Sequence, residues 1–404
     1  MEKKNPADIA ADKYFDLQMS RAKRSKPSDI LLVLILAVFV FAVAVCVWAI
    51  PHKDFSEDEN RYLATAADID FAEDLMSGKL TGEIADIYSD QFPLRRALVE
   101  LKAIFELALF KHENNGVILG RDGALIDRLE YTAEDEQTIR ENLGSIERFL
   151  AKLSGNNCEV FFALAPRSID VLDRYLPALY SGDRNGSVKK ILDPDRLPYI
   201  DLETAIKENG DEYVWFLTDH HWTPLGAYYA YRALSEKLGF APFALADFEN
   251  ETVSESFFGT TYSKAGIYSV NPDTITLLRY AGDSDFKVTN GETGEIILEG
   301  FYDRAKLEAK DKYSVFLGGD YGHIKISDGE EKEKLLVIKD SYFDSIAPFL
   351  ARHFELDVID LRYFSGSAAE YARLSGAEKI LILCGADSLA TSSVFTQLEY
   401  KLDQ

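Results

Sequence analysis

The chain has 404 residues, of which 47% are apolar and 12% aromatic, and its formal net charge is −24. This length allows two or three domains, and the apolar content excludes a disordered chain. Because nucleic acid and anionic lipid headgroups repel so acidic a surface, neither is expected as a partner.

The first predicted element is a transmembrane helix over residues 30–50, a run without any charged residue. The run is long enough to cross the hydrocarbon layer of a bilayer as a helix. Basic residues lie just before it and acidic residues follow from Asp54, so the positive-inside rule puts a tail over 1–29 in the cytoplasm and the main domain outside the cell. We therefore expect a single-pass protein of the cell membrane. A cleaved signal peptide is the alternative, although its apolar part is usually shorter.

Two regions are expected after this span: a membrane-proximal helical segment over 51–115 and a larger α/β domain over 116–404. The larger domain begins with a predicted hairpin around an Arg-Asp-Gly turn, and an amphipathic helix follows over 133–153. Between 241 and 330, short strand-like runs alternate with Asn-Gly, Asp-Gly and Gly-Glu turns. This pattern predicts a β-rich insertion.

Apolar strands alternate with helices through the rest of the domain. The predicted strands are Val160–Pro166, Tyr199–Leu202, Leu335–Ile338, Leu356–Leu361 and Lys379–Cys384. Helices are expected at Ser341–Phe354 and Ala368–Leu374, between the last three strands. Such alternation predicts a mainly parallel sheet covered by helices on both faces, which is a three-layer α/β/α arrangement.

Cysteine usage argues against covalent or metal cross-links. Only Cys158 and Cys384 lie outside the predicted membrane span, so the sequence contains neither a disulfide framework nor a cysteine zinc site. We expect no metal and no cofactor.

The run Asp-His-His-Trp that begins at Asp219 is the first candidate for chemistry. In an extended segment, Asp219 and His221 lie on the same face, and His220 points the other way. A carboxylate so placed can hold one imidazole nitrogen and leave the other free as a base. Thr223 and Pro224 then predict a helix start. An isolated Asp-x-His pair can also be purely structural.

The second candidate is the run Leu335-Leu-Val-Ile-Lys-Asp-Ser-Tyr. A buried strand there leads into a turn that puts Ser341 at the start of a helix. Ligands and nucleophiles of open α/β sheets lie at this carboxyl end, where helix N–H groups can also stabilise an oxyanion. The alternative is structural, because Ser341 with Asp344 three residues later also fits a capping box.

Together these runs resemble the DHHW family of bacterial exported proteins, whose signature Thr218-Asp-His-His-Trp matches. The resemblance covers nearly everything from residue 54 to the end, and it extends to the SGNH-hydrolase-like proteins that O-acetylate exported polysaccharides such as alginate. Further matching runs are Ser89-Asp-Gln-Phe-Pro-Leu-Arg, Asn115-Gly-Val-Ile-Leu-Gly, Phe258-Gly-Thr-Thr-Tyr-Ser-Lys, Tyr313-Ser-Val-Phe-Leu-Gly-Gly, Lys339-Asp-Ser-Tyr and Asp360-Leu-Arg-Tyr.

The resemblance implies an SGNH-hydrolase-like fold with a Ser-His-Asp triad. Ser341 is then the nucleophile, His221 the base and Asp219 the residue that orients the base. The residues implied for the oxyanion and substrate-binding parts of the site are Gly319, Tyr342, Arg167 and His220.

The sequence departs from the family pattern at two acidic positions. Asp320 and Asp344 stand where members of the family often have asparagine. A carboxylate near an oxyanion site opposes the developing negative charge, so each should either point away or weaken catalysis. The Gly319 N–H remains available as a donor on this interpretation.

The activity implied is transfer of an acetyl or similar acyl group to a hydroxyl of a cell-surface or exported glycan. A membrane-bound O-acyltransferase is implied as the donor of the acyl group. The same three residues also suit a carbohydrate esterase, in which water is the acceptor. A non-catalytic glycan-binding or assembly protein with this fold is a further alternative.

Overall fold

The computed structural model describes residues 27–128, 130–153, 158–178, 180 and 187–399. They form two compact units, one comprising residues up to 56 with 61–99, and the other comprising 57–60 with the residues from 100 onward. Most of the predicted cytoplasmic tail, residues 1–26, lies outside the described residues.

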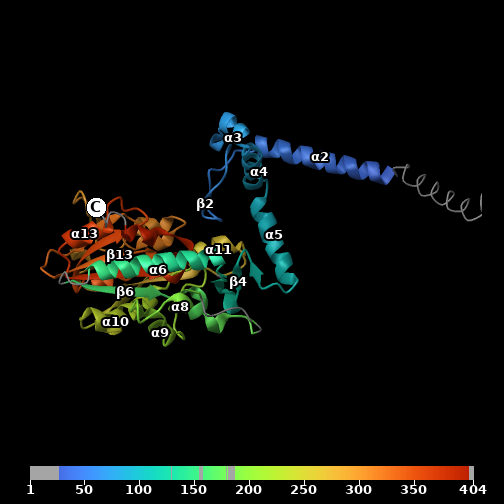
Figure 1. The fold of residues 1–404 in the computed structure, drawn as a ribbon. Helices are drawn as coiled ribbons and strands as arrows, with labels where there is room; N and C mark the ends of the chain where they lie inside the picture. Colours follow the sequence, from blue (N-terminus) through green and yellow to red (C-terminus); the bar gives the residue numbers. More distant parts are fainter. Residues whose placement is uncertain (1–26, 129, 154–157, 179, 181–186, 400–404) are drawn as a thin grey trace, which may run out of the picture. The chain divides into compact units, whose positions relative to one another are not determined.

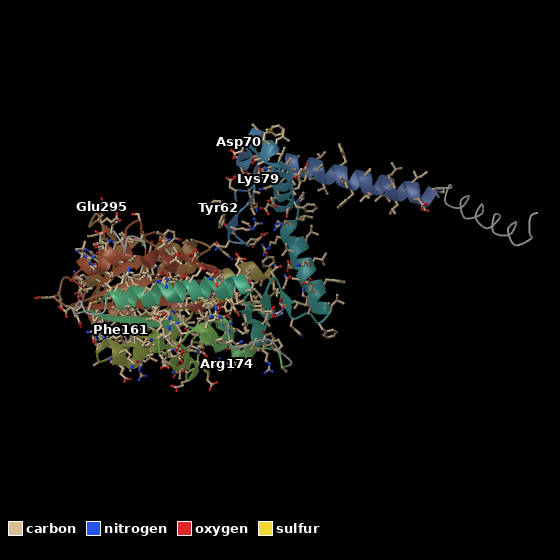
Figure 2. The ribbon with its side chains drawn as sticks, in the orientation of Figure 1. Tyr62, Asp70, Lys79, Phe161, Arg174 and Glu295 are labelled. Carbon is tan, nitrogen blue, oxygen red and sulfur yellow. The ribbon has the colours of Figure 1, made fainter. Side chains whose placement is uncertain are left out.

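The first unit contains one long apolar helix, α2 (Pro27–Ala49). By length and composition it can cross a membrane, and its apolar side chains are exposed along most of its length. A short hairpin and helices follow: β1 (Phe55–Ser56), β2 (Arg61–Tyr62), α3 (Phe71–Ser77), α4 (Leu80–Asp90) and the start of α5 (Arg95–Ala108). Asp70, labelled in Figure 2, caps α3 by accepting hydrogen bonds from two backbone N–H groups.

The second unit is built on an eight-stranded sheet with the order β11-β10-β12-β14-β13-β15-β6-β7. Its strands are β6 (Glu159–Ala165), β7 (Ile200–Asp201), β10 (Lys287–Asn290), β11 (Ile296–Glu299), β12 (His323–Ser327), β13 (Glu333–Lys339), β14 (Phe354–Asp360) and β15 (Lys379–Gly385). Two smaller sheets contain β3 (Glu113–Asn114), β4 (Val117–Leu119) and β5 (Leu125–Asp127), and β8 (Glu249–Phe257) and β9 (Asp273–Arg279).

The large sheet is mainly parallel, as expected, but three antiparallel strands make it a mixed sheet. The five strands from β14 to β7 are parallel, whereas β12, β10 and β11 add on antiparallel. The three added strands come from the predicted β-rich insertion, where a short turn joins the neighbours β10 and β11. A turn of this length permits only antiparallel pairing, because parallel strands need a long crossover.

Helices cover both faces of this sheet, as Figure 1 shows for α6 and α10. Leu335 and Val337 of β13 face one cluster of buried residues, and the alternate Leu336 and Ile338 face the other. On the first face lie α9 (Leu202–Lys207), α10 (Pro224–Leu238) and α12 (Ala347–Leu350). On the second lie α6 (Ala133–Leu153), α13 (Ala368–Leu374) and α14 (Ala386–Thr391). Side chains fill the space between these layers (Figure 2).

Several local predictions are confirmed and one is wrong. The hairpin around Arg121–Gly123 is present as β4 and β5, and α10 begins at Pro224 after Thr223, whose hydroxyl caps it. The helix expected over 341–354 is instead divided into a 3-10 turn, η8 (Ser341–Phe343), and α12. Pro348 explains the break, since it lacks the N–H that a continuous helix needs at that point.

Candidate active site

The Asp-His-His run lies on a closed loop rather than on a strand. Trp215 and Trp222 form a bridge at its base. Within it, the buried carboxylate of Asp273 accepts hydrogen bonds from the Leu217 and Thr218 N–H groups at 2.8 and 2.7 Å and from the Thr218 hydroxyl. The loop's inward-facing donors are thereby satisfied, which fixes the backbone just before Asp219.

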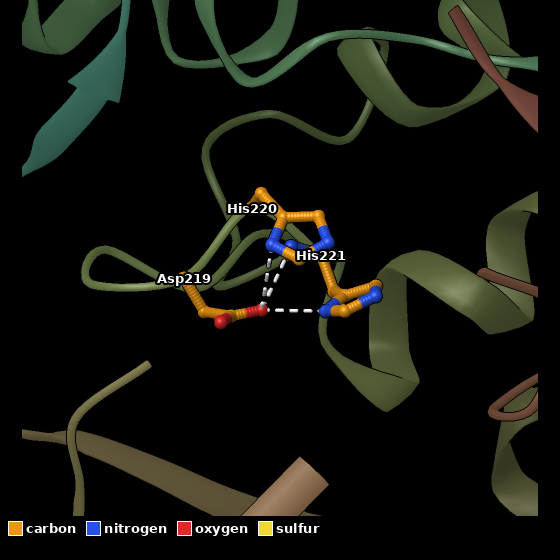
Figure 3. A group of neighbouring side chains, drawn as sticks. All are labelled: Asp219, His220 and His221. Carbon is orange, nitrogen blue, oxygen red and sulfur yellow. Dashed lines mark hydrogen bonds and ion pairs between the residues drawn. The ribbon is translucent and has the colours of Figure 1, made fainter. Parts of the chain in front are cut away.

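Asp219 and His221 are paired, although not by the extended geometry predicted from their spacing. One carboxylate oxygen of Asp219 accepts hydrogen bonds from the His221 N–H at 3.0 Å and from His221 Nδ1 at 2.6 Å (Figure 3). The side chain bonds the backbone two residues on, as in an Asx turn. His220 therefore does not point to the opposite side, and its ring centroid lies 3.8 Å from that of His221.

The second oxygen of Asp219 is bound by Thr260, the first residue of α11 (Thr260–Ala265). The Thr260 N–H and hydroxyl donate to it at 2.7 and 3.0 Å. Gly259 permits this approach, because a Cβ there would lie 2.2 Å from Asp219. Burial alone would raise the pKa of Asp219, but His220, His221 and these hydrogen bonds hold it below its usual range. Asp219 is therefore an ionised acceptor at neutral pH.

His221 also reaches Ser341. Its Nε2 lies 2.8 Å from the Ser341 Oγ. Because the Asp219 carboxylate can only accept, His221 Nδ1 carries the proton of that bond, and Nε2 can accept the proton of the serine hydroxyl. The three side chains thus form a continuous Asp-His-Ser relay, with Ser341 half-buried at the end of β13.

The capping box considered for Ser341 and Asp344 is absent, because Asp340 caps η8 instead. Asp340 accepts from the Tyr342 N–H at 3.1 Å. Its other oxygen accepts from the Gly385 N–H at 2.7 Å and the Ser388 hydroxyl at 2.6 Å, which ties the turn to the end of β15. The Ser341 hydroxyl is therefore left for His221, and no described residue accepts a hydrogen bond from the Ser341 N–H.

The imidazole of His221 lies between two other rings. His220 is on one side, and the Tyr313 ring is stacked on the other at 3.9 Å with an interplanar angle of 4°. The Tyr313 hydroxyl donates to the Ser341 carbonyl oxygen at 3.2 Å, and the Tyr342 hydroxyl donates to the His220 carbonyl oxygen at 2.7 Å. Both tyrosines therefore brace the relay, and the Tyr342 hydroxyl is bound within the protein rather than directed to a substrate.

Two other residues predicted for the site have partners of their own. Gly319 has φ +116°, a conformation that favours glycine, and its N–H makes a long 3.4 Å bond to the Phe316 carbonyl. Arg167 follows β6, at the same edge of the sheet as Ser341, and its guanidinium binds both oxygens of Asp170 at 2.9 and 2.8 Å. Their roles toward a substrate stay predictions.

The two unusual carboxylates are part of a charge network beside the relay, in which Lys339, Asp344 and Asp360 are buried while Asp320 and Arg362 are exposed. The Lys339 ammonium lies 2.8 Å from Asp320, 2.9 Å from Asp344 and 3.4 Å from Asp360. Arg362 pairs with Asp320 at 2.9 Å and with Asp360. Burial opposes the ionisation of Asp320, but Lys339 and Arg362 lower its pKa. Its negative charge is thus compensated locally rather than directed at the serine.

The group Asp219, His220 and His221 could also supply three metal ligands, since the ligand atoms lie within 4.8 Å of one another. The hydrogen bonds argue against this use. Asp219 already accepts from the His221 N–H, His221 Nδ1 and Thr260, so both of its oxygens are engaged within the protein. The donor set suits proton relay better than metal binding.

Sequence reasoning missed the residues that support the relay. Thr260 and Tyr313 lie in the runs Phe258-Gly-Thr-Thr and Tyr313-Ser, which carried the family resemblance without being given a role. Their place in those runs was the sequence evidence that could have identified the two residues. The contacts themselves join positions 41 and 28 residues apart, so no local pattern could assign them.

Two family models match the second unit. Residues 199–359 match the family described as "DHHW protein", and residues 117–266 match the "SGNH hydrolase-like domain, acetyltransferase AlgX". The resemblance predicted from the sequence, to DHHW proteins and to SGNH-hydrolase-like acetyltransferases, is confirmed.

Similar proteins agree with these matches. The "probable alginate O-acetylase AlgJ" of Pseudomonas putida is 32% identical over 174 residues, which cover 40% of this chain and 44% of that protein. The corresponding protein of Pseudomonas syringae pv. tomato is 30% identical over 189 residues, covering 44% and 46%. The chain thus spans less than half the length of these relatives.

Solved structures share the fold. A DHHW family protein from Eubacterium siraeum has a TM-score of 0.58 and 25% identity, covering 70% of this chain and 95% of that one. PatB1 of Bacillus cereus, solved with a sulfonyl adduct, has a TM-score of 0.56 and 23% identity, covering 70% and 98%. The α/β fold is therefore of the kind expected from the sequence.

Proposed function

We propose that this chain is a membrane-anchored, extracytoplasmic O-acyltransferase that transfers an acetyl or similar small acyl group to a hydroxyl of a cell-surface or exported polysaccharide. The observation that carries the proposal is the relay in which His221 bonds Asp219 at 2.6 Å and Ser341 at 2.8 Å. The relatives named for alginate O-acetylation support the acyl group and the polysaccharide class.

In the first step Ser341 becomes acylated. His221 Nε2 takes the hydroxyl proton as Ser341 Oγ attacks the carbonyl carbon of the acyl donor. The negative charge that develops on the carbonyl oxygen is stabilised by nearby N–H donors, of which the Ser341 N–H at the start of η8 is the first candidate. Collapse of the tetrahedral intermediate breaks the bond to the leaving group, which receives the proton from His221.

In the second step the acyl group passes to the glycan. His221 Nε2 removes the proton of a sugar hydroxyl, whose oxygen attacks the acyl carbonyl. Ser341 Oγ then leaves and regains its proton from His221, so the enzyme returns to its starting state. Asp219 keeps His221 in the required tautomer and orientation in both steps.

The proposal includes a membrane anchor formed by α2 and a donor partner in the membrane. The support for the anchor is the length and apolar composition of the helix. A membrane-bound O-acyltransferase is the class of partner that would supply acyl groups from the cytoplasmic side.

Mass spectrometry of the purified protein tests the chemistry. After incubation with p-nitrophenyl acetate, we expect a single acetyl group on Ser341 and none on the Ser341→Ala variant. Release of that group by water alone, with no transfer to any glycan, would favour a carbohydrate esterase. Glycan binding without any acyl-enzyme would leave a non-catalytic binding protein.

A further inference from the structure

We propose that Asp387 belongs to the subsite for the acceptor sugar, where it binds hydroxyl groups of a neutral or cationic glycan rather than a polyuronate. This inference rests on the proposed function and specifies its acceptor. Asp387 lies outside the relay, and neither the spacing of the sequence nor the family resemblance pointed to it.

Its position follows from the turn that carries Ser341. Asp340, directly before Ser341, binds the Gly385 N–H at 2.7 Å and the Ser388 hydroxyl at 2.6 Å. Asp387 lies between these two anchoring residues, on the first turn of α14. Because β13 and β15 are parallel neighbours, the ends that carry Ser341 and Asp387 meet at one edge of the sheet.

Asp387 is a half-buried carboxyl group with few partners. Among the described residues, its side chain accepts one hydrogen bond, from the Tyr131 hydroxyl at 3.3 Å, and it has no ion pair. Burial, followed by repulsion from Asp127, raises its pKa to about 7, against the attraction of Arg167 and His220. Neither of its oxygens is among the buried unpaired side-chain atoms of the described residues, so the oxygen without a partner is open to solvent and to a ligand. A carboxyl group with a perturbed pKa beside a candidate active site is a candidate functional group.

The two carboxylates that raise the pKa of Asp387 by repulsion are satisfied within the protein. Asp127 binds the Lys264 ammonium at 2.5 Å and the Thr261 hydroxyl at 3.2 Å. Asp170 holds the Arg167 guanidinium at two positions. Asp387 alone in this group still lacks strong donors, and sugar hydroxyls supply such donors.

The charge of the site selects the class of sugar. Ionised Asp387 and the net charge of −24 repel a polyanionic chain, whereas the charges of Asp127 and Asp170 are paired with Lys264 and Arg167. A neutral hexose or an amino sugar meets no such repulsion, and its hydroxyl or ammonium groups can donate to Asp387. The acceptor therefore differs in charge from alginate, the polyuronate for which the relatives are named.

Equilibrium binding tests the subsite without requiring catalysis. In the Ser341→Ala background, calorimetry with chitohexaose and cellohexaose should show binding that Asp387→Asn weakens about tenfold or more, the usual effect of losing a charged hydrogen bond. The matched control is Asp195→Asn, an exposed carboxylate in the loop before β7, which should leave binding unchanged. A mannuronate hexamer should bind more weakly than either neutral probe.

Acyl transfer, measured in protein that retains Ser341, distinguishes failure of this inference from failure of the proposed function. Asp387→Asn should acquire acetyl on Ser341 from p-nitrophenyl acetate at the normal rate but transfer it to chitohexaose about tenfold more slowly. Wild-type protein that never acquires acetyl refutes the proposed function, whereas the binding result still decides the subsite. The inference is overturned if Asp387→Asn binds and transfers as well as the wild type. It is also overturned if neither neutral hexamer binds.

Discussion

The position of the His221 side chain is fixed from four directions. Asp219 and Ser341 bind its two nitrogens, and the rings of His220 and Tyr313 lie on its two faces. The two rings restrict rotation of the imidazole, while the hydrogen bonds set its tautomer. A base held in this way needs little reorganisation when it accepts a proton, which is the condition for efficient general-base catalysis.

Substitution of the two histidines should have unequal effects. His221→Ala removes the group that contacts Ser341 and should lower the rate of Ser341 acylation by about 10²–10⁴-fold. His220→Ala removes a tilted ring contact worth about 0.5–1.5 kcal/mol and the hydrogen bond between His220 Nδ1 and the Thr260 hydroxyl, so the rate should fall by roughly tenfold or less. Burst kinetics with p-nitrophenyl acetate measure both. Equal loss in the two variants would mean that His220 takes part directly in the chemistry.

Thr260 is expected to support the relay through Asp219. Thr260→Val removes the hydroxyl that donates to Asp219 at 3.0 Å but keeps the N–H bond, so acylation should slow by about tenfold. The neighbouring Thr261→Val is a matched control, since that hydroxyl binds Asp127 instead. The same rate in wild type and Thr260→Val would show that the backbone bond alone suffices.

The residues of the site illustrate which features a sequence can predict. Asp219 and His221 were identified as partners from their spacing, yet the extended geometry assumed for them is wrong, since an Asx turn brings them together. Ser341 was predicted from its place just after the apolar run Leu335–Ile338, because such a run indicates a buried strand. Thr260 could not be predicted, since its contact depends on how distant segments pack.

At the scale of elements, Asp340 joins two adjacent strand ends. Asp340→Ala leaves the N–H groups of Tyr342 and Gly385 without their acceptor, so the free energy of unfolding should fall by roughly 2–3 kcal/mol. Ser341→Ala loses only the bond to His221 and should cost less than about 1 kcal/mol, with all acyl transfer abolished. Denaturant titration and the acylation assay measure the two effects. If Ser341→Ala were instead the less stable of the two variants, Ser341 would be the residue that caps the turn.

The alternation of strands and helices in the sequence predicted the parallel part of the sheet. Each parallel strand is buried on both faces, so its sequence is a continuous apolar run. The antiparallel half was not foreseen. Strands such as β10 and β11 are short and partly exposed, and nothing in their own residues specifies which sheet they join. Their place is determined by the edge that β14 leaves free for β12.

The charge network behind β13 should make stability depend on pH. Burial raises the pKa of Asp344 to about 8 against the attraction of Lys339, and repulsion from Asp320 and Asp360 adds to the rise. Between its ordinary pKa and 8 the folded state therefore binds more protons than the unfolded state, and the free energy of unfolding falls as pH rises through this range. In Asp344→Asn this contribution is absent, so the variant should gain stability relative to wild type from pH 5 to 8.5.

Denaturant titrations of both proteins at several pH values test this expectation. The difference in unfolding free energy between the variant and the wild type should increase with pH and level off above about 8. Curves that run parallel across the range would show that Asp344 is ionised in the folded protein throughout.

At the scale of the whole molecule, an acidic α/β unit and an apolar helix lie on one chain. The chain's net charge of −24 gives it no attraction to anionic lipid headgroups, so headgroup attraction cannot hold it at the membrane. Any membrane attachment would then come from apolar surface, and α2 has the length and composition of a membrane-spanning helix. On the proposed function, this helix would be the anchor of an extracytoplasmic enzyme.

Fractionation tests the tether. The full chain should stay with membranes in 1 M salt, because burial of α2 in the hydrocarbon layer does not depend on charge, whereas a chain lacking residues 27–50 should be soluble. Ile35→Arg with Phe39→Arg is a milder variant that should weaken insertion, since each arginine at the helix centre costs about 2.5–3.5 kcal/mol. A C-terminal tag digested by protease on intact cells would establish the outward orientation. Recovery of a soluble mature form that begins near Ile50 would instead identify a cleaved signal peptide.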